Sequence, residues 1–221
     1  MCGRFALFAP GEQLAEQFGV ELNHELEPRY NIAPTQAVAA IRLAASTGER
    51  ELTYFRWGLI PSWAKDPKIG SRMINARSET AAEKPSFRAA FKRRRCLIPA
   101  SGFYEWQRLE DRKQPTFIHA SDDSLLGLAG LWEIWQANDG SVVETCTILT
   151  TQPNEMMASI HNRMPVIIEA EDYSMWLDPG PQPQDALHLM RPYPAKGMEA
   201  YPVSTAVNNP RNDAAVCVEP V

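Results

Sequence analysis

The sequence predicts an α+β protein with a single domain over residues 1–221, an antiparallel barrel-like β core, short flanking helices and a basic groove. Strand-like segments follow one another closely between residues 95 and 151, and half of the Lys and Arg residues fall in one stretch. Short strands separated by turns at this density are typical of an antiparallel sheet or barrel. No internal repeat or linker divides the 221 residues, which are enough to bury one large core.

The amino-terminal part predicts one helix followed by a strand hairpin. Leu14 and Phe18 lie four residues apart and Gly19 follows them, which indicates a short amphipathic helix ended by a glycine. The apolar stretches 37–43 and 51–61 flank a polar turn, as in a hairpin.

Residues 61–85 contain prolines, a glycine and mixed polarity, so we expect mostly loop there, with a short helix at 78–83. Pro85 suits the first turn of a second helix over 85–95. In that helix Phe87 and Phe91 form an apolar stripe, and the basic residues Arg88, Lys92 and Arg95 fall on another face.

The second half of the chain is mainly strand-like. Four predicted strand regions follow one another, at 95–107, 115–120, 125–135 and 143–151. Short helices are expected at 154–161 and 171–177, with a strand at 163–168 between them. The tail holds one strand-like piece before a polar turn.

The charge is unevenly distributed along the chain. Between Arg56 and Arg95 there are eleven Lys or Arg and three Asp or Glu, a local net charge of +8, although the whole chain carries −5. Such a patch can attract an anionic polymer despite an acidic total, whereas a solvated helix face with basic decoration is the plainer interpretation.

The four cysteines and four histidines show no metal-ligand spacing, so we expect no metal and no cofactor. Scattered cysteines fit reduced thiols and a cytoplasmic location. We see no signal peptide and no apolar run long enough for a membrane span, so no membrane association is expected.

Cys2 follows the initiator methionine directly. Cells usually remove Met1 when the second residue is small, which would leave Cys2 with an α-amine beside its thiol. The amine has a pKa near ~7.7–8.0 and the thiol near ~8.5, so both are partly nucleophilic at neutral pH. Together they can condense with an aldehyde, first to an imine and then to a thiazolidine ring. Taken alone, an incidental cysteine at this position is the commoner explanation.

Three further stretches carry candidate polar residues. Asn75 and Arg77 lie in the basic region, where an amide can donate and accept hydrogen bonds and a guanidinium suits phosphate. Glu105 lies between two aromatic residues in a strand-like stretch, and alternation places it on the opposite face from both. His161 and Arg163 follow a short helical segment. Each of these residues alone is more often structural than catalytic.

Seven motifs in order give a specific resemblance. MCGRF, RYNIAP (29–34), WGLIPSW (57–63), INARSET (74–80), CLIPASGFYEW (96–106), IHNRMPVI (160–167) and VSTAVNNPRND (203–213) resemble the SRAP family of SOS response-associated peptidases or abasic-site processing proteins. The resemblance covers essentially the whole chain, with no motif missing, and implies a single SRAP-type domain.

The resemblance implies covalent capture of abasic sites in single-stranded DNA, which shields the lesion during the DNA damage response. By motif match, Cys2 is the nucleophile that forms a thiazolidine with the ring-opened sugar aldehyde. Asn75 is expected to hydrogen-bond near the captured sugar, Glu105 to transfer protons at the Cys2 amine, and His161 to act as acid and base on the sugar oxygen.

The same resemblance implies the partner and its contacts. The partner is single-stranded DNA with abasic sites, bound through phosphate by Arg4, Arg77 and Arg163, with Trp63 and Trp106 against the bases. We expect a monomer, cytoplasmic and nucleoid-associated on DNA if the source is bacterial. For Arg72 and the KRRR run at 92–95 a DNA role is weaker, and a solvated helix face is the preferred interpretation of the run.

Three other functions stay open. Class II glutamine amidotransferases also begin with Met-Cys-Gly, but their later motifs differ. A cysteine peptidase could use Cys2, His161 and Glu105, best as self-processing of the leading residue. A non-catalytic reader of modified bases in DNA would need the basic groove but not the free amine.

Overall fold

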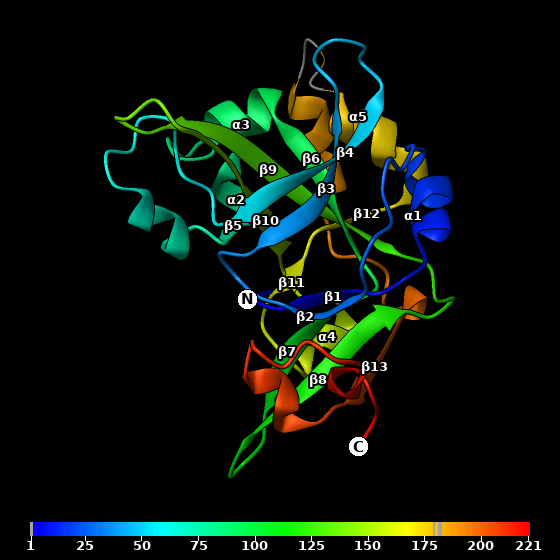
Figure 1. The fold of residues 1–221 in the computed structure, drawn as a ribbon. Helices are drawn as coiled ribbons and strands as arrows, with labels where there is room; N and C mark the ends of the chain where they lie inside the picture. The colour runs from blue at the N-terminus through cyan, green and yellow to red at the C-terminus, as the bar shows by residue number, and fades with distance from the viewer. Residues whose placement is uncertain (1, 179, 181–182) are drawn as a thin grey trace.

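The centre of the molecule is a closed barrel of five strands (Figure 1). This computed structural model describes residues 2–178, 180 and 183–221. Around the barrel the strands are neighbours in the order β3, β4, β10, β9, β6 and back to β3. Their bounds are β3 Ala37–Leu43, β4 Arg50–Trp57, β6 Arg95–Ala100, β9 Leu126–Gln136 and β10 Val142–Thr151.

Most neighbouring strands in the barrel are antiparallel, and one parallel strand pair closes the barrel. The hairpin β3–β4 keeps one register from Ala37 opposite Arg56 to Leu43 opposite Arg50. Closure comes from β10, which pairs in parallel with β4 at Thr145 opposite Arg56. The prediction of an antiparallel barrel-like core is confirmed in its main features, and this parallel closure is the difference.

The barrel interior is filled with large apolar side chains, and two of the four cysteines belong to this packing. Trp57, Leu97 and Ile148 are fully buried, as are Cys96 and Cys146. A Cβ atom on Gly130 would lie 2.7 Å from the Cys96 sulfur, so glycine is needed where the thiol packs. Burial raises the pKa of both thiols, which makes them poor nucleophiles.

A second sheet lies against one end of the barrel, below it in Figure 1. Its strand order is β13, β8, β7, β1, β2. The bounds are β1 Phe5–Leu7, β2 Arg29–Ile32, β7 Gly102–Arg108, β8 Lys113–Ala120 and β13 Met198–Pro202. On one face a small cluster forms from Ala6, Tyr104, Phe117, Val203, Val207 and Cys217, and this face carries the carboxyl-terminal segment. The other face joins the main core, which includes Phe5, Phe103 and Ile118.

Helices are short and lie around this β core. The α-helices are α1 Gly11–Phe18, α2 Ser78–Ala81, α3 Arg88–Arg93, α4 Glu155–Ala158 and α5 Tyr173–Leu177. Helix α1 ends at Gly19, whose φ of 64° is left-handed, as the sequence predicted. Short 3₁₀ turns cover Pro67–Arg72, Ala170–Asp172, Pro183–Leu189, Ala195–Gly197, Thr205–Asn208 and Ala215–Cys217.

Two local predictions were only partly correct. The stretch expected as loop contains the 3₁₀ turn Pro67–Arg72 and the short strand β5 (Asn75–Arg77), which pairs in parallel with β10. The strand expected at 163–168 is split into β11 (Met164–Pro165) and β12 (Ile167–Ile168), which pair with β10 and β9 respectively. Both cases involve pairing with strands far away in sequence, which local composition does not report.

The basic helix also ends earlier than predicted. Helix α3 stops at Arg93, and Arg95 begins strand β6 as a residue only 4% exposed. Its guanidinium donates to the backbone oxygens of Phe91, Trp176 and Asp178, while Arg94 pairs with Glu133 at 2.6 Å. Of the KRRR run only Lys92 and Arg93 face solvent, so the interpretation as a solvated helix face fits two of its four residues.

Across the described part of the chain, no helix has the length and apolar character needed to cross a bilayer. The predicted basic groove stays a prediction. The exposed side chains of Arg56, Lys65, Lys68, Arg72 and Arg77 supply its charge.

Candidate active site

Cys2 lies close to Glu105, just before the start of β1. Phe5 lies opposite Phe103 and Ala6 opposite Gly102, and the Tyr104 amide donates to the Arg4 carbonyl oxygen at 2.9 Å. Alternation along β7 points Glu105 to the same face of the second sheet as Phe103. The Cys2 side chain belongs to the main core with Phe5 and Phe103, and the charge of Glu105 acts on its thiol.

The Cys2 side chain is fully buried, and its thiol is not in a thiolate-favouring environment. Burial raises the pKa of the Cys2 thiol far above its usual range, and the nearby negative charge of Glu105 adds to the effect. The resting sulfur is thus a protonated thiol, which attacks only after a base accepts its proton.

Glu105 is 3% exposed and faces away from its two aromatic neighbours. Tyr104 and Trp106 belong to the cluster under the carboxyl-terminal segment, so the alternation predicted from the sequence is observed. Burial raises the pKa of the Glu105 carboxyl, and the charge of nearby His161 opposes this shift. A buried carboxyl of this kind is a candidate for proton transfer.

His161 lies 3.9 Å from Glu105, measured from Nε2 to Oε2. It follows α4, whose amino end is capped by the Asn154 side chain, which accepts from the Met157 amide at 2.8 Å. His161 Nδ1 lies 3.0 Å from the Arg163 amide, which donates to it, and 3.2 Å from the Arg163 oxygen. These contacts hold the ring so that Nε2 faces Glu105.

Asn75 comes from the barrel side of the site. In β5 it lies opposite Ile148, and its Nδ2 donates weakly to the Ile148 oxygen at 3.4 Å. Its Oδ1 is buried and accepts no hydrogen bond from the described residues. A buried acceptor left open in this way is available to a ligand.

Strand β10 brings the remaining predicted residues to one place. Its end carries β5 on one side and β11 on the other, because Arg77 lies opposite Thr150 and Pro165 also pairs with Thr150. The segment with His161 and Arg163 leads directly into β11. Asn75 and His161 therefore flank the same end of β10.

The five predicted DNA contacts differ in what they touch. Arg77 and Trp63 face solvent, with Trp63 59% exposed. Arg163 binds Glu79 with both terminal nitrogens, at 2.5 and 2.9 Å. Arg4 donates to Asn31 and to the Val207 oxygen, and Trp106 donates to Asn208. All five DNA contacts stay predictions, and three of these side chains already hold other parts of the protein.

The segment that carries Trp63 is anchored by backbone packing. A Cβ atom on Gly58, whose φ is 129°, would lie 2.7 Å from the Gly70 oxygen. The indole of Trp57 donates to the Ile74 oxygen at 2.8 Å, and that of Trp135 donates to the Ala64 oxygen at 2.7 Å. Two buried indoles and one glycine thus fix the position of Trp63.

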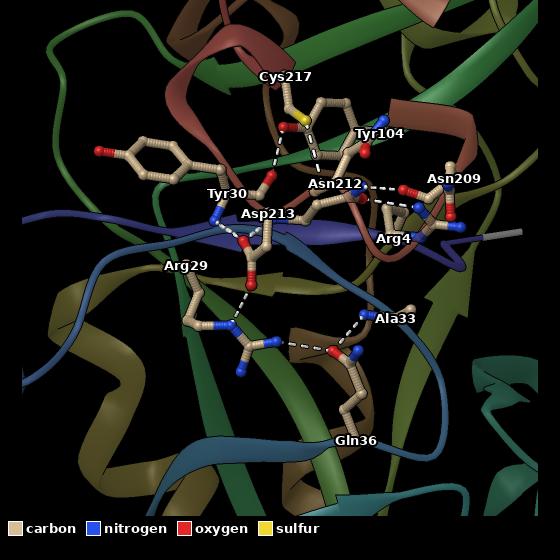
Figure 2. Close-up of polar contacts among 11 residues, drawn as sticks. Arg4, Arg29, Tyr30, Ala33, Gln36, Tyr104, Asn209, Asn212, Asp213 and Cys217 are labelled. Carbon is tan, nitrogen blue, oxygen red and sulfur yellow. Dashed lines mark hydrogen bonds and ion pairs between the residues drawn. The ribbon is translucent and has the colours of Figure 1, made fainter. Parts of the chain in front are cut away.

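A buried polar network next to Arg4 was not predicted from the sequence. Figure 2 shows Arg4, Tyr30, Tyr104 and Asp213 around it. Asn31 is fully buried at its centre and contacts both chain ends. The motif RYNIAP contains Tyr30 and Asn31, and VNNPRND contains Asp213, so an asparagine inside a strand was the available signal.

A large cavity lies elsewhere. It has a volume of about 1650 Å³ between the end of α1, the β3–β4 turn and α5, and none of the predicted site residues lines it. Its charged lining is mainly acidic, with Glu16, Glu21, Glu49, Glu51, Asp178 and Asp185 against Arg50 and Arg95. Such a surface repels phosphate. The described residues contain no group of three or more His, Cys, Asp or Glu that could hold a metal ion.

Fold and site together define a mixed β protein whose second residue is a cysteine, close to a buried glutamate and a partly exposed histidine. The family model described as "SOS response associated peptidase (SRAP)" matches residues 1–210, and the chain belongs to this family.

Two named relatives align with most or all of this chain. The chain is 47% identical over 224 residues to the abasic site processing protein YoqW of Bacillus subtilis, with 99% of each chain covered. It is 37% identical over 223 residues to the abasic site processing protein HMCES of Xenopus tropicalis, with 87% of this chain and 66% of that protein covered. A crystal structure of a protein from Bacteroides thetaiotaomicron superposes with a TM-score of 0.89 at 26% identity, covering both chains fully.

Proposed function

We propose that this protein processes abasic sites in DNA by forming a covalent bond between Cys2 and the ring-opened sugar. The names of its relatives support the substrate. The observation that carries the chemistry is the buried Cys2 thiol beside the Glu105–His161 pair. Removal of Met1, which the reaction requires, concerns a residue outside those that the structure describes.

The raised thiol pKa sets the order of steps. Because the resting sulfur is protonated, the α-amine of Cys2 attacks the aldehyde carbon first and gives a carbinolamine. Protonation of its hydroxyl releases water and leaves the imine. The thiol then adds to the imine carbon and transfers its proton to a base, and the imine nitrogen gains a proton. Aldehyde and aminothiol thus become thiazolidine and one water molecule.

Glu105 suits both proton transfers. Its carboxyl, with a pKa raised by burial, can donate a proton to the departing hydroxyl and, once ionised, accept the thiol proton. His161 presents Nε2 to Glu105 and can assist opening of the sugar ring as acid or base. The open acceptor of Asn75 can receive a hydroxyl of the opened sugar.

For DNA we propose single-stranded binding on the surface that presents Trp63 and Arg77. An exposed indole on an anchored segment can stack on a base, and an exposed guanidinium can bind phosphate. Binding should weaken as salt increases and show little sequence preference.

The peptidase alternative receives less support from the geometry. A nucleophile–base–orienter set needs the histidine between cysteine and carboxylate. Here the carboxylate of Glu105 is the group close to both the Cys2 strand and His161. This order fits proton exchange at an amine better than activation of a thiol by histidine.

The test is crosslinking of Cys2→Ala to an oligonucleotide with one abasic site. We expect no complex on a denaturing gel, because the thiol and hence the thiazolidine are lost, and nearly unchanged binding of intact single-stranded DNA. Cys146→Ala is the matched control, since it removes a buried thiol inside the barrel and should crosslink normally. A denaturation-resistant complex with Cys2→Ala would contradict the mechanism, and intact mass of the adduct would report the loss of Met1 as well.

A further inference from the structure

Asn31 is a fully buried amide at the meeting point of three chain segments. From β2, its Oδ1 accepts a hydrogen bond from Arg4 Nη1 at 2.6 Å. Its Nδ2 faces three backbone oxygens of the carboxyl-terminal segment, Val207 at 3.2 Å, Asn209 at 3.1 Å and Asn212 at 2.6 Å. Both ends of the amide are therefore satisfied, as burial requires.

Asp213 fixes the backbone on which Asn31 sits. One carboxylate oxygen accepts from the amides of Tyr30 at 2.6 Å and Asn31 at 2.9 Å, and the other accepts from the Arg29 guanidinium (Figure 2). A single carboxylate thus holds the backbone of Tyr30 and Asn31 in β2.

Arg4 is held by its side chain and by its backbone. Its Nη1 also donates to the Val207 oxygen at 2.6 Å, and its carbonyl oxygen accepts from the Tyr104 amide at 2.9 Å. The Tyr104 hydroxyl donates in turn to the Tyr30 oxygen at 2.6 Å. These contacts form a closed ring through β1, β2 and β7, so Arg4 cannot shift without breaking at least one of them.

The ring lies close in sequence to Cys2 and Glu105, the two residues of the proposed reaction. Arg4 is two residues from Cys2, and Tyr104 is bonded directly to Glu105. We propose that Asn31 is a positioning residue, which acts through Arg4 to hold Cys2 buried against Glu105. This inference rests on the proposed function for its catalytic consequence, whereas the placement of Cys2 can be measured without DNA.

The first experiment measures that placement. The full chain is treated with N-ethylmaleimide in the absence of DNA, and labelling of each cysteine is followed by peptide mass spectrometry. In Asn31→Ala we expect Cys2 to be labelled at least about tenfold faster than in the unaltered protein, because local opening exposes its thiol. Cys96 and Cys146, deep in the barrel, are internal controls and should stay protected.

Gln17→Ala is the matched control variant. Gln17 is also an amide that bonds distant groups, the backbone of Leu125 and the Tyr173 hydroxyl, but it lies on α1. Its loss should leave Cys2 labelling unchanged. Equal acceleration of Cys2 in both variants, or no acceleration in Asn31→Ala, would overturn the proposal.

The second experiment follows single-turnover crosslinking as DNA concentration is varied. Misplacement of the nucleophile should lower the maximal rate of Asn31→Ala by about tenfold or more while the affinity for intact DNA changes less than about threefold. In an Arg4→Ala background the same substitution should have little further effect, because its action passes through Arg4. Full additivity, or an unchanged maximal rate, would refute the proposed role.

Failure of the proposed function and failure of the proposed role of Asn31 give different results. If the unaltered protein forms no crosslink, the proposed function fails while the labelling result still decides the role of Asn31. If Asn31→Ala does not fold, Asp213→Ala tests the same ring from outside, since its carboxylate is partly exposed and fixes the Asn31 backbone. Faster labelling of Cys2 in Asp213→Ala supports the proposal, and labelling at the unaltered rate contradicts it.

Discussion

Glu105 combines deep burial with two functional neighbours, the strand of Cys2 and the imidazole of His161. Its carboxyl is held towards the protonated form by burial, and its position on a paired strand fixes its direction. A surface carboxylate, the plainer interpretation of the sequence, would have neither property.

Glu105→Gln keeps the shape of the side chain but removes its titration. We expect a crosslinking rate lower by roughly 10²–10⁴-fold, the usual contribution of a general acid or base, with intact-DNA binding little changed. In the unaltered protein, the crosslinking rate should first rise with pH as the amine deprotonates. It should then fall at high pH, as Glu105 loses its proton above its raised pKa. Single-turnover rates between pH 5 and 9 measure this limb.

The descending limb should be absent in Glu105→Gln, whose rate should rise with pH as the amine deprotonates. His161→Ala is the companion variant and should slow crosslinking more than it weakens binding. Identical pH profiles for Glu105→Gln and the unaltered protein, or equal losses of rate and affinity, would mean that these residues are structural.

Single residues were predictable where a motif carried them. Cys2, Glu105 and His161 were named from motifs, and strand register with one short distance brings them together. Asn31 was not found because most of its partners are backbone oxygens more than 170 positions away. Backbone acceptors leave no trace in residue identity, so only the folded chain reveals such a network.

At the scale of elements, the segment between Gly58 and β5 shows how backbone packing positions a side chain. Gly58→Ala adds a Cβ 2.7 Å from the Gly70 oxygen at a φ of 129°. We expect a loss of stability beyond about 1–3 kcal/mol, since the strain of the backbone and the clash act together. The displaced segment should carry Trp63 away from its position and weaken single-stranded DNA binding. Urea denaturation and a binding titration measure the two effects.

Gly140→Ala distinguishes the effect of backbone strain at a positive φ from the effect of a steric clash. Gly140 also has a positive φ, 86°, but a Cβ there would have no atom within 4 Å. It should cost less stability and leave DNA binding unchanged. Similar losses in both variants would show that the contact between Gly58 and Gly70 does not set the position of the segment.

Most elements could be predicted because apolar periodicity is local information. The helix ended by Gly19 and the hairpin β3–β4 formed as expected. The parallel pairing of β10 with β4 and β5 could not be predicted in this way, because about ninety or seventy residues separate the partners. Strand β5 is three residues long and exists through that pairing alone, so its own composition resembles loop.

For the whole molecule, buried acids predict the response to alkaline pH. Burial raises the pKa of Cys96 and Cys146, and raises that of Tyr173 to about 12. In the unfolded chain the thiols ionise near ~8.5, so above this pH the folded state binds more protons and the free energy of unfolding falls. Each such group lowers it by about 1.4 kcal/mol per pH unit until its folded pKa is reached.

Urea unfolding at pH 7.5, 8.5 and 9.5 measures this slope. Cys146→Ala is the control and should show a shallower loss of stability with pH, because one buried thiol no longer contributes. A free energy of unfolding that stays constant to pH 9.5 would show that these thiols titrate normally in the folded protein.

The contacts of Asn31 with Val207, Asn209 and Asn212 can form only late in the synthesis of the chain. Residue 2 leaves the ribosome about two hundred residues before the segment that completes the ring around Arg4. At about 5–20 residues per second this interval is on the order of ten seconds or more. Throughout it the amino end of the nascent chain lacks its final partners and is open to an aminopeptidase. The placement of Cys2 that the proposed reaction uses is thereby completed only after residue 212 has been made.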